Sequence, residues 1–100
     1  MITVNFQYVG VDVSETLSAF TKEKLEKLAH KFDFIISAQV YFKQDEKDHN
    51  NGKICNIELS LPGPRIYATS NEKNFEMSVS ETIRDLKRQL SKRKEVFKTH

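Results

Sequence analysis

The last third of the chain, residues 72–100, carries an apolar stripe at the spacing of an α-helix. Its apolar side chains recur at intervals of three, four and seven residues, which places them on one side of a helix. These side chains are Phe75, Val79, Ile83, Leu86, Leu90 and Phe97. We therefore predict one long amphipathic helix over 72–100, capped by Ser70 or Asn71. Such a helix needs a second layer of structure to cover its apolar side.

The other side of this predicted helix is strongly positive. From residue 84 onward seven cations face only Asp85 and Glu95, so the local net charge is +5, against +2 for the whole chain. A merely solvated helix face usually mixes Lys with Glu in supporting pairs. The excess of one sign favours a surface that binds a polyanion. The cations are Arg84, Lys87, Arg88, Lys92, Arg93, Lys94 and Lys98.

Residues 2–33 predict a strand followed by a shorter helix. Residues 2–9 alternate apolar and polar side chains, as a half-buried strand does. After Gly10, Ser14 can cap a helix that Asp33 ends. The apolar side of this helix consists of Leu17, Thr21, Leu25, Leu28 and Phe32.

Three more segments return to the period of two that is typical of strands. The first begins at residue 35, the second covers 55–61, and the third covers 65–70. In the second segment, Cys55 is in phase with the side chains that point inward. A polar loop over 44–53 and the Pro-Gly-Pro turn over 62–64 predict antiparallel pairing of these three strands. The helical crossover between the first two strands allows a parallel pair. We predict an α+β fold of order β-α-β-β-β-α, a two-layer sandwich with a four-stranded sheet and both helices packed on one face.

The shorter helix adds a second row of cations. Lys24, Lys27 and Lys31 fall within roughly 60° of one another on a helical projection and can join the cationic side of the last helix. The carboxylates of residues 45, 46 and 48 lie instead in the polar loop, which we expect to point away. On the open sheet face, Tyr41 and Tyr67 could stack RNA bases, although a simple cross-strand pair is the favoured interpretation.

Several functional classes lack a signal in this sequence. One domain over residues 1–100 is expected, with no membrane span, no signal sequence and a cytoplasmic location. The single cysteine excludes an internal disulfide, and burial is the expected role of Cys55. His30, His49 and His100 are scattered, and no cluster has metal-ligand spacing. We therefore expect no metal, no cofactor, no small-molecule substrate and no enzymatic activity.

Two motifs resemble those of a known family. The first is EKLEKL over residues 23–28, followed by Phe32-Asp33 and Ile35, and the second is LKRQLSKRK over 86–94. The order of the two motifs, the β-α-β-β-β-α frame and the length of the chain all match one family. The whole chain resembles the short ribosome hibernation promoting factors and ribosome-associated inhibitors, of the sigma-54 modulation protein family. It departs from their pattern at Asn74-Phe75-Glu76 and at Arg84-Asp85, where the order of charges is reversed.

The resemblance implies a translation inhibitor that binds the small ribosomal subunit (30S) and its 16S rRNA in stationary phase or stress. It would occupy the decoding-region channel and sterically block tRNA and mRNA. Cations at positions that match the family's RNA-facing motifs are Lys24, Lys27, Arg88, Lys92 and Lys94. Charge and periodicity add Lys31, Arg84, Lys87, Arg93 and Lys98. The short form has no C-terminal extension domain, and a separate ribosome-dimerising factor is a possible further partner.

Two alternatives stay open at the level of sequence. A helix pair on a small sheet also suits a general double-stranded RNA-binding module, because A-form RNA is recognised largely by shape. A regulatory α+β domain that binds a small ligand or a protein partner would need a concave pocket or an exposed apolar patch. The sequence indicates neither a concave pocket nor an exposed apolar patch.

Overall fold

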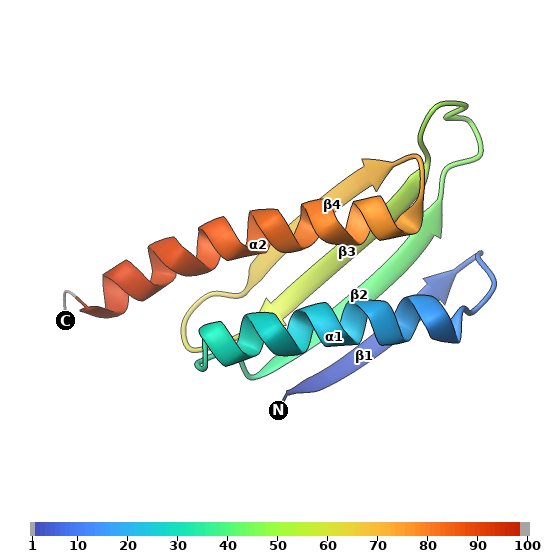
Figure 1. Ribbon diagram of the computed structural model, residues 1–100. Helices are drawn as coiled ribbons and strands as arrows, with labels where there is room; N and C mark the ends of the chain where they lie inside the picture. Colours follow the sequence, from blue (N-terminus) through green and yellow to red (C-terminus); the bar gives the residue numbers. More distant parts are fainter. Residues whose placement is uncertain (1, 99–100) are drawn as a thin grey trace.

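The computed structural model describes residues 2–98, with side chains through Phe97. The elements follow the predicted order β-α-β-β-β-α (Figure 1). They are β1 (Thr3–Val9), α1 (Glu15–Lys31), β2 (Ser37–Gln44), β3 (Lys53–Ser60), β4 (Ile66–Glu72) and α2 (Phe75–Lys98). The predicted fold class is therefore confirmed.

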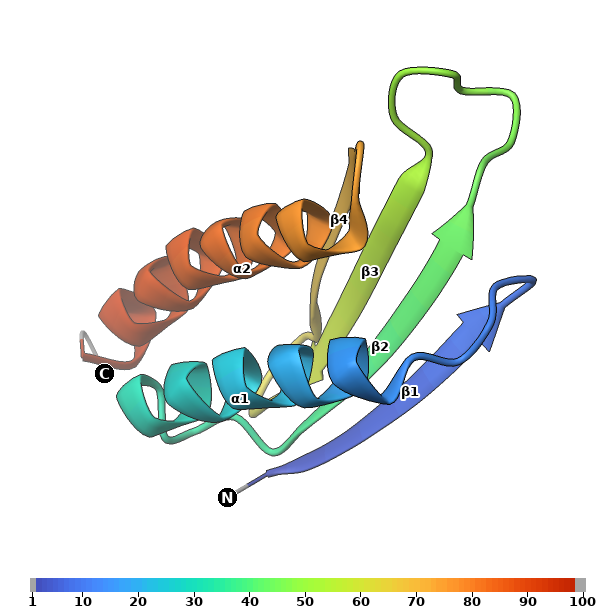
Figure 2. The same cartoon turned by 45° about the vertical axis from the view of Figure 1, so that its right-hand side comes forward.

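The four strands form one sheet in the order β1-β2-β3-β4. β1 pairs with β2 in parallel, because α1 returns the chain to the starting edge, and the two hairpins make the other pairs antiparallel. The register aligns Phe6, Val40, Ile57 and Ala68 in one row across the sheet. Both helices cover the same face of the sheet, and the opposite face is open (Figures 1 and 2).

The hydrophobic core lies between this sheet face and the two helices. Alternate residues of the inner strands are fully buried, as the period of two predicts. From α2, Val79, Leu86 and Leu90 each have 0% exposure. Cys55 is also buried here, as expected, and burial raises the pKa of its thiol to about 12. The predicted helical stripe is thus the contact between α2 and the sheet.

The start of α2 differs from the sequence prediction. The helix begins at Phe75 rather than at residue 72, and its cap is Asn74, whose Oδ1 accepts the backbone N–H of Met77 at 2.8 Å. Antiparallel pairing to Lys53 keeps the chain extended through Glu72. The predicted cap Asn71 instead accepts the N–H of Gly52 from the hairpin loop. Strand pairing between β3 and β4 therefore delays the start of α2 relative to the prediction.

The end of α2 also corrects a prediction. The last turns of the helix project past the sheet (Figure 1), so Phe97 has no strand beneath it and is 40% exposed. The apolar stripe is buried in the core only as far as Leu90. Ser14 is correctly predicted as the cap of α1, since its Oγ accepts the N–H of Leu17 at 3.1 Å.

Truncation of the buried stripe should destabilise the fold strongly. We expect Leu86→Ala to lower the free energy of unfolding by about 2–5 kcal/mol, because it removes buried methyl groups and leaves a cavity. Met77→Ala, on the same helix but 37% exposed, should cost less than about 1 kcal/mol. Urea titrations of both variants measure this difference. An unchanged midpoint for Leu86→Ala would exclude the stripe as core.

Candidate nucleic-acid interface

α1 and α2 lie side by side and run in the same direction, so their C-terminal ends meet at one end of the molecule (Figure 2). A groove of about 310 Å³ runs between them. Leu28 and Ile83 provide its apolar lining, and four lysines surround these two side chains. We call this feature the lysine groove, with Lys24, Lys27, Lys31 and Lys87 as its cations. The cationic rows predicted on separate helices thus come together.

Like charges at the groove are close enough to affect one another. The ammonium of Lys87 lowers the pKa of Lys31, through its charge and a side-chain contact, and Lys94 adds a smaller effect of the same sign. The Lys31 side chain is fully exposed, so water and salt weaken this repulsion. Lysines that repel one another in the free protein would be stabilised by a bound polyanion.

Several of the predicted cations form ion pairs with neighbours on their own helix. Lys27 lies 3.3 Å from Glu23, Arg84 lies 3.1 Å from Glu81, and Arg88 lies 3.3 Å from Asp85. All six side chains are well exposed, from 40% upward. Exposed pairs of this kind contribute little to stability. Their cations can therefore exchange a carboxylate for a phosphate at small cost.

Arg93 has a different environment from the other predicted cations. Its two terminal nitrogens donate to the carbonyl oxygens of Pro62 at 3.0 Å and Pro64 at 2.9 Å. Gln89, one turn earlier, donates to the carbonyl of Tyr67 at 2.8 Å. These bonds fasten α2 to the β3–β4 turn and to β4. Sequence reasoning counted Arg93 only as an RNA-binding cation and missed this role, because the turn lies some thirty residues away.

Aromatic rings support several of the lysines. The Nζ of Lys24 lies 5.0 Å from the ring centre of Phe20. The Nζ atoms of Lys31 and Lys94 lie 5.7 and 5.9 Å from the ring centre of Phe32. These are distances at which a cation is attracted to an aromatic face. Phe32, the residue that follows α1, thus lies beside cations of both helices.

The remaining predicted cations lie on α2. Lys92 is exposed, and Lys98 ends the helix with a side chain outside the described part of the chain. The acidic hairpin loop between β2 and β3 lies at the opposite end of the molecule from the C-terminal ends of both helices (Figure 1). There Asp48 accepts the N–H groups of Asn50 and Asn51, which hold the pKa of its carboxyl below the usual range. The carboxylates of this loop therefore lie far from the C-terminal ends of the helices.

The open sheet face is a poorer surface for phosphate. Glu58 lies there at 2.7 Å from Arg65, and it also hydrogen-bonds Tyr67. The hydrogen bond and the charge of Glu58 raise the pKa of the Tyr67 hydroxyl. A carboxylate beside the exposed tyrosine ring would repel an RNA backbone.

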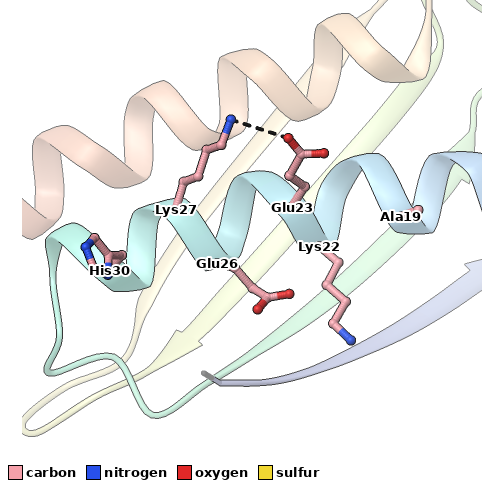
Figure 3. A pocket seen from close by; sticks show the side chains of 6 residues that line it. All are labelled: Ala19, Lys22, Glu23, Glu26, Lys27 and His30. Atoms are coloured by element: carbon pink, nitrogen blue, oxygen red, sulfur yellow. Dashed lines mark ion pairs between the residues drawn. The ribbon is translucent and has the colours of Figure 1, made fainter.

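A shallow depression on the outer side of α1 is another concave feature of the surface (Figure 3). It is lined by Ala19, Lys22, Glu23, Glu26, Lys27 and His30. All six residues come from one helix, so no second element encloses a ligand. Within the described residues no group of three or more His, Cys, Asp and Glu side chains could hold a metal ion. None of the described helices is long and apolar enough to cross a membrane.

Comparisons with known proteins identify the family and the fold of the chain. The chain is 29% identical over 91 residues to the ribosome hibernation promoting factor of Escherichia coli strain K12, covering 91% of this chain and 92% of that one. The same values hold for the factor of Shigella flexneri. A ribosomal subunit interface protein from Coxiella burnetii has a similar structure, with a TM-score of 0.83 and 27% identity over 95% of this chain and 99% of that one.

The N-terminal domain of Thermus thermophilus Protein Y, at 14% identity, shares the fold with a TM-score of 0.78, over 92% of this chain and 98% of that one. The family model described as "Sigma 54 modulation protein / S30EA ribosomal protein" matches residues 4–98. The match covers every strand and helix except the first residue of β1. The chain therefore belongs to the sigma 54 modulation and S30EA ribosomal protein family.

Proposed function

We propose that this protein is a ribosome-binding translation inhibitor that contacts rRNA of the small subunit through the lysine groove and the outer side of α2. The observation that carries the proposal is the gathering of cations from both helices: Lys31 and Lys87 line one groove, and Lys31 and Lys94 lie beside the same Phe32 ring. The printed names of the relatives, a hibernation promoting factor and a subunit interface protein, support the same partner.

In this proposal the protein binds 16S rRNA in the decoding-region channel, during stationary phase or stress. The described chain is elongated, with extents of 47 × 23 × 18 Å, and its cations follow the long axis of α2. A body of this shape, held by phosphates, would occupy space that tRNA and mRNA need. Inhibition would then be steric and would require no catalytic step. The site of action is the cytoplasm, where ribosomes are found.

Affinity in such a site comes mainly from phosphate contacts. Each Lys or Arg that neutralises a phosphate releases bound counterions, so the logarithm of the binding constant falls linearly with the logarithm of salt concentration. The slope reports how many phosphates are neutralised, whereas total affinity does not. Salt dependence is therefore the measurement that identifies which cations contact RNA.

Removal of three groove-side cations should weaken binding to 30S subunits and flatten its salt dependence. We expect a variant with Lys31, Lys87 and Lys94 all replaced by Gln to lose about two units of slope, because each lost phosphate contact contributes about 0.7–0.9. Its circular dichroism should match that of the wild type, since these side chains are exposed. Equilibrium binding to purified 30S subunits across a salt series measures the slope.

The matched control replaces Lys43, Lys47 and Lys73 with Gln, three exposed cations at the hairpin-loop end of the sheet. This variant has the same net charge but should keep nearly the wild-type slope. Equal losses in the two variants would mean that overall charge, and not this face, holds the protein on the ribosome. Binding of arbitrary RNA duplexes as tightly as 30S subunits would favour a general double-stranded RNA-binding module.

A single substitution should separate binding from stability. The pKa of Lys31 is lower in the folded chain than in the unfolded one, so its protonated form destabilises the fold below that folded pKa. This penalty disappears as the pH rises through the unfolded value. At neutral pH, Lys31→Gln should therefore raise the thermal midpoint slightly while weakening 30S binding.

Lys22→Gln is the control for this test, because Lys22 lies on the same helix and points away from α2 (Figure 3). The stabilisation by Lys31→Gln should vanish near 1 M salt, where the screening length is about 3 Å. Calorimetric scans at low and high salt measure both effects. A lower midpoint for Lys31→Gln at low salt would contradict the assigned repulsion.

A further inference from the structure

Aromatic rings reach the surface at the C-terminal end of the lysine groove. Phe34, in the connection between α1 and β2, and Phe97, in the last turns of α2, meet edge to face with ring centres 5.0 Å apart. Phe34 also lies 6.1 Å from Phe32, which is 2% exposed. The rings thus form a continuous row from the core to Phe97, which is 40% exposed.

Cations of the proposed RNA-binding surface flank this row of rings. The Nζ atoms of Lys31 and Lys94 both lie within 6 Å of the Phe32 ring centre. The C-terminal ends of α1 and α2 lie at the same end of the molecule (Figures 1 and 2), and the ring contacts connect Phe32, beside these lysines, to Phe97. An exposed aromatic face beside cations is the combination that binds an unpaired nucleotide, by stacking its base and neutralising its phosphate.

We propose that Phe34 and Phe97 form a platform that stacks an unpaired base of rRNA, while Lys31 and Lys94 hold the adjoining phosphates. This inference rests on the proposed function and adds a substrate preference to it. The ends of the two helices would select a single-stranded or bulged nucleotide, and the lysine groove would follow the backbone. A continuous duplex offers no free base face to such a platform.

Charge favours this surface over the open sheet face as the place for stacking. Tyr67 is more exposed than Phe97, at 58% against 40%, but its hydroxyl is bonded to Glu58. That carboxylate is also paired with Arg65 at 2.7 Å, so the cation beside Tyr67 is already engaged and is not free to hold the phosphate of a stacked base. At the helix ends, the Nζ atoms of Lys31 and Lys94 lie 5.7 and 5.9 Å from the ring centre of Phe32, at the inner end of the row. The lysines beside the Phe32–Phe34–Phe97 row therefore favour it over the Tyr67 surface, where the nearby cation is paired with a carboxylate.

The alternative is that the Phe34–Phe97 contact only fastens the end of α2. Phe97→Leu separates the two roles, because leucine keeps an apolar contact with Phe34 but has no aromatic face. Phe97→Tyr restores the ring and serves as the rescue variant. Val96→Ala, at the neighbouring exposed position, controls for a general change in the last turns.

Equilibrium binding to purified 30S subunits over a salt series tests the platform, together with thermal midpoints of each variant. We expect Phe97→Leu to bind about 5- to 100-fold more weakly, the range for one lost base–aromatic stack. Its salt slope and thermal midpoint should stay at wild-type values, and Phe97→Tyr and Val96→Ala should bind like the wild type.

Two results would overturn the platform. Wild-type affinity in Phe97→Leu would mean that no base stacks on this ring. Weaker binding with a flattened salt slope would mean that the helix end has frayed and lost its phosphate contacts, so the ring is only a fastener. Failure of the wild type itself to bind 30S subunits would instead refute the proposed function, and the two failures are therefore distinguishable.

Discussion

The burial of one side of α2 against β3 and β4 determines where everything else on this helix lies. Leu86 and Leu90 are completely buried, so the helix cannot rotate about its axis without exposing them. Lys87 and Lys94 are then held on the side that faces α1 and solvent. Gln89 also hydrogen-bonds β4, and Arg93 hydrogen-bonds the turn between β3 and β4. These bonds hold α2 in the same rotation about its axis. Core packing thus determines which way the cations of α2 face.

Topology explains why the cations of two separate helices meet. Because β1 and β2 are parallel, α1 must run back against them, and α2 follows β4 in the same direction as α1 (Figure 2). The C-terminal ends of both helices therefore share one end of the molecule. The negative ends of the helix dipoles favour cations there. Lys31, the last residue of α1, lies within reach of this field, whereas Lys87 lies in the middle of α2 and does not.

Periodicity was sufficient to predict the element order, the two-layer architecture and the joined rows of lysines, because each follows from local spacing. It was not sufficient where residues distant in sequence decide the outcome. Pairing of Glu72 with Lys53 moved the start of α2, and the turn carbonyls at Pro62 and Pro64 engage Arg93. Phe97 has the helical spacing of a core residue, but the sheet ends before it. No local pattern reports how far a sheet extends beneath a helix.

In the proposed complex the groove side of α2 faces rRNA. Single introduced cysteines can be labelled selectively, since burial and a pKa of about 12 make Cys55 unreactive. Ser91 lies one turn after Lys87 and is exposed, whereas Asn50 lies in the distant hairpin loop. An iron chelate attached to Ser91→Cys and bound to 30S subunits should cleave 16S rRNA around the decoding region, and the same chelate on Asn50→Cys should cleave it far less. Stronger cleavage from Asn50→Cys would show that the opposite end of the protein faces the RNA and would contradict the account.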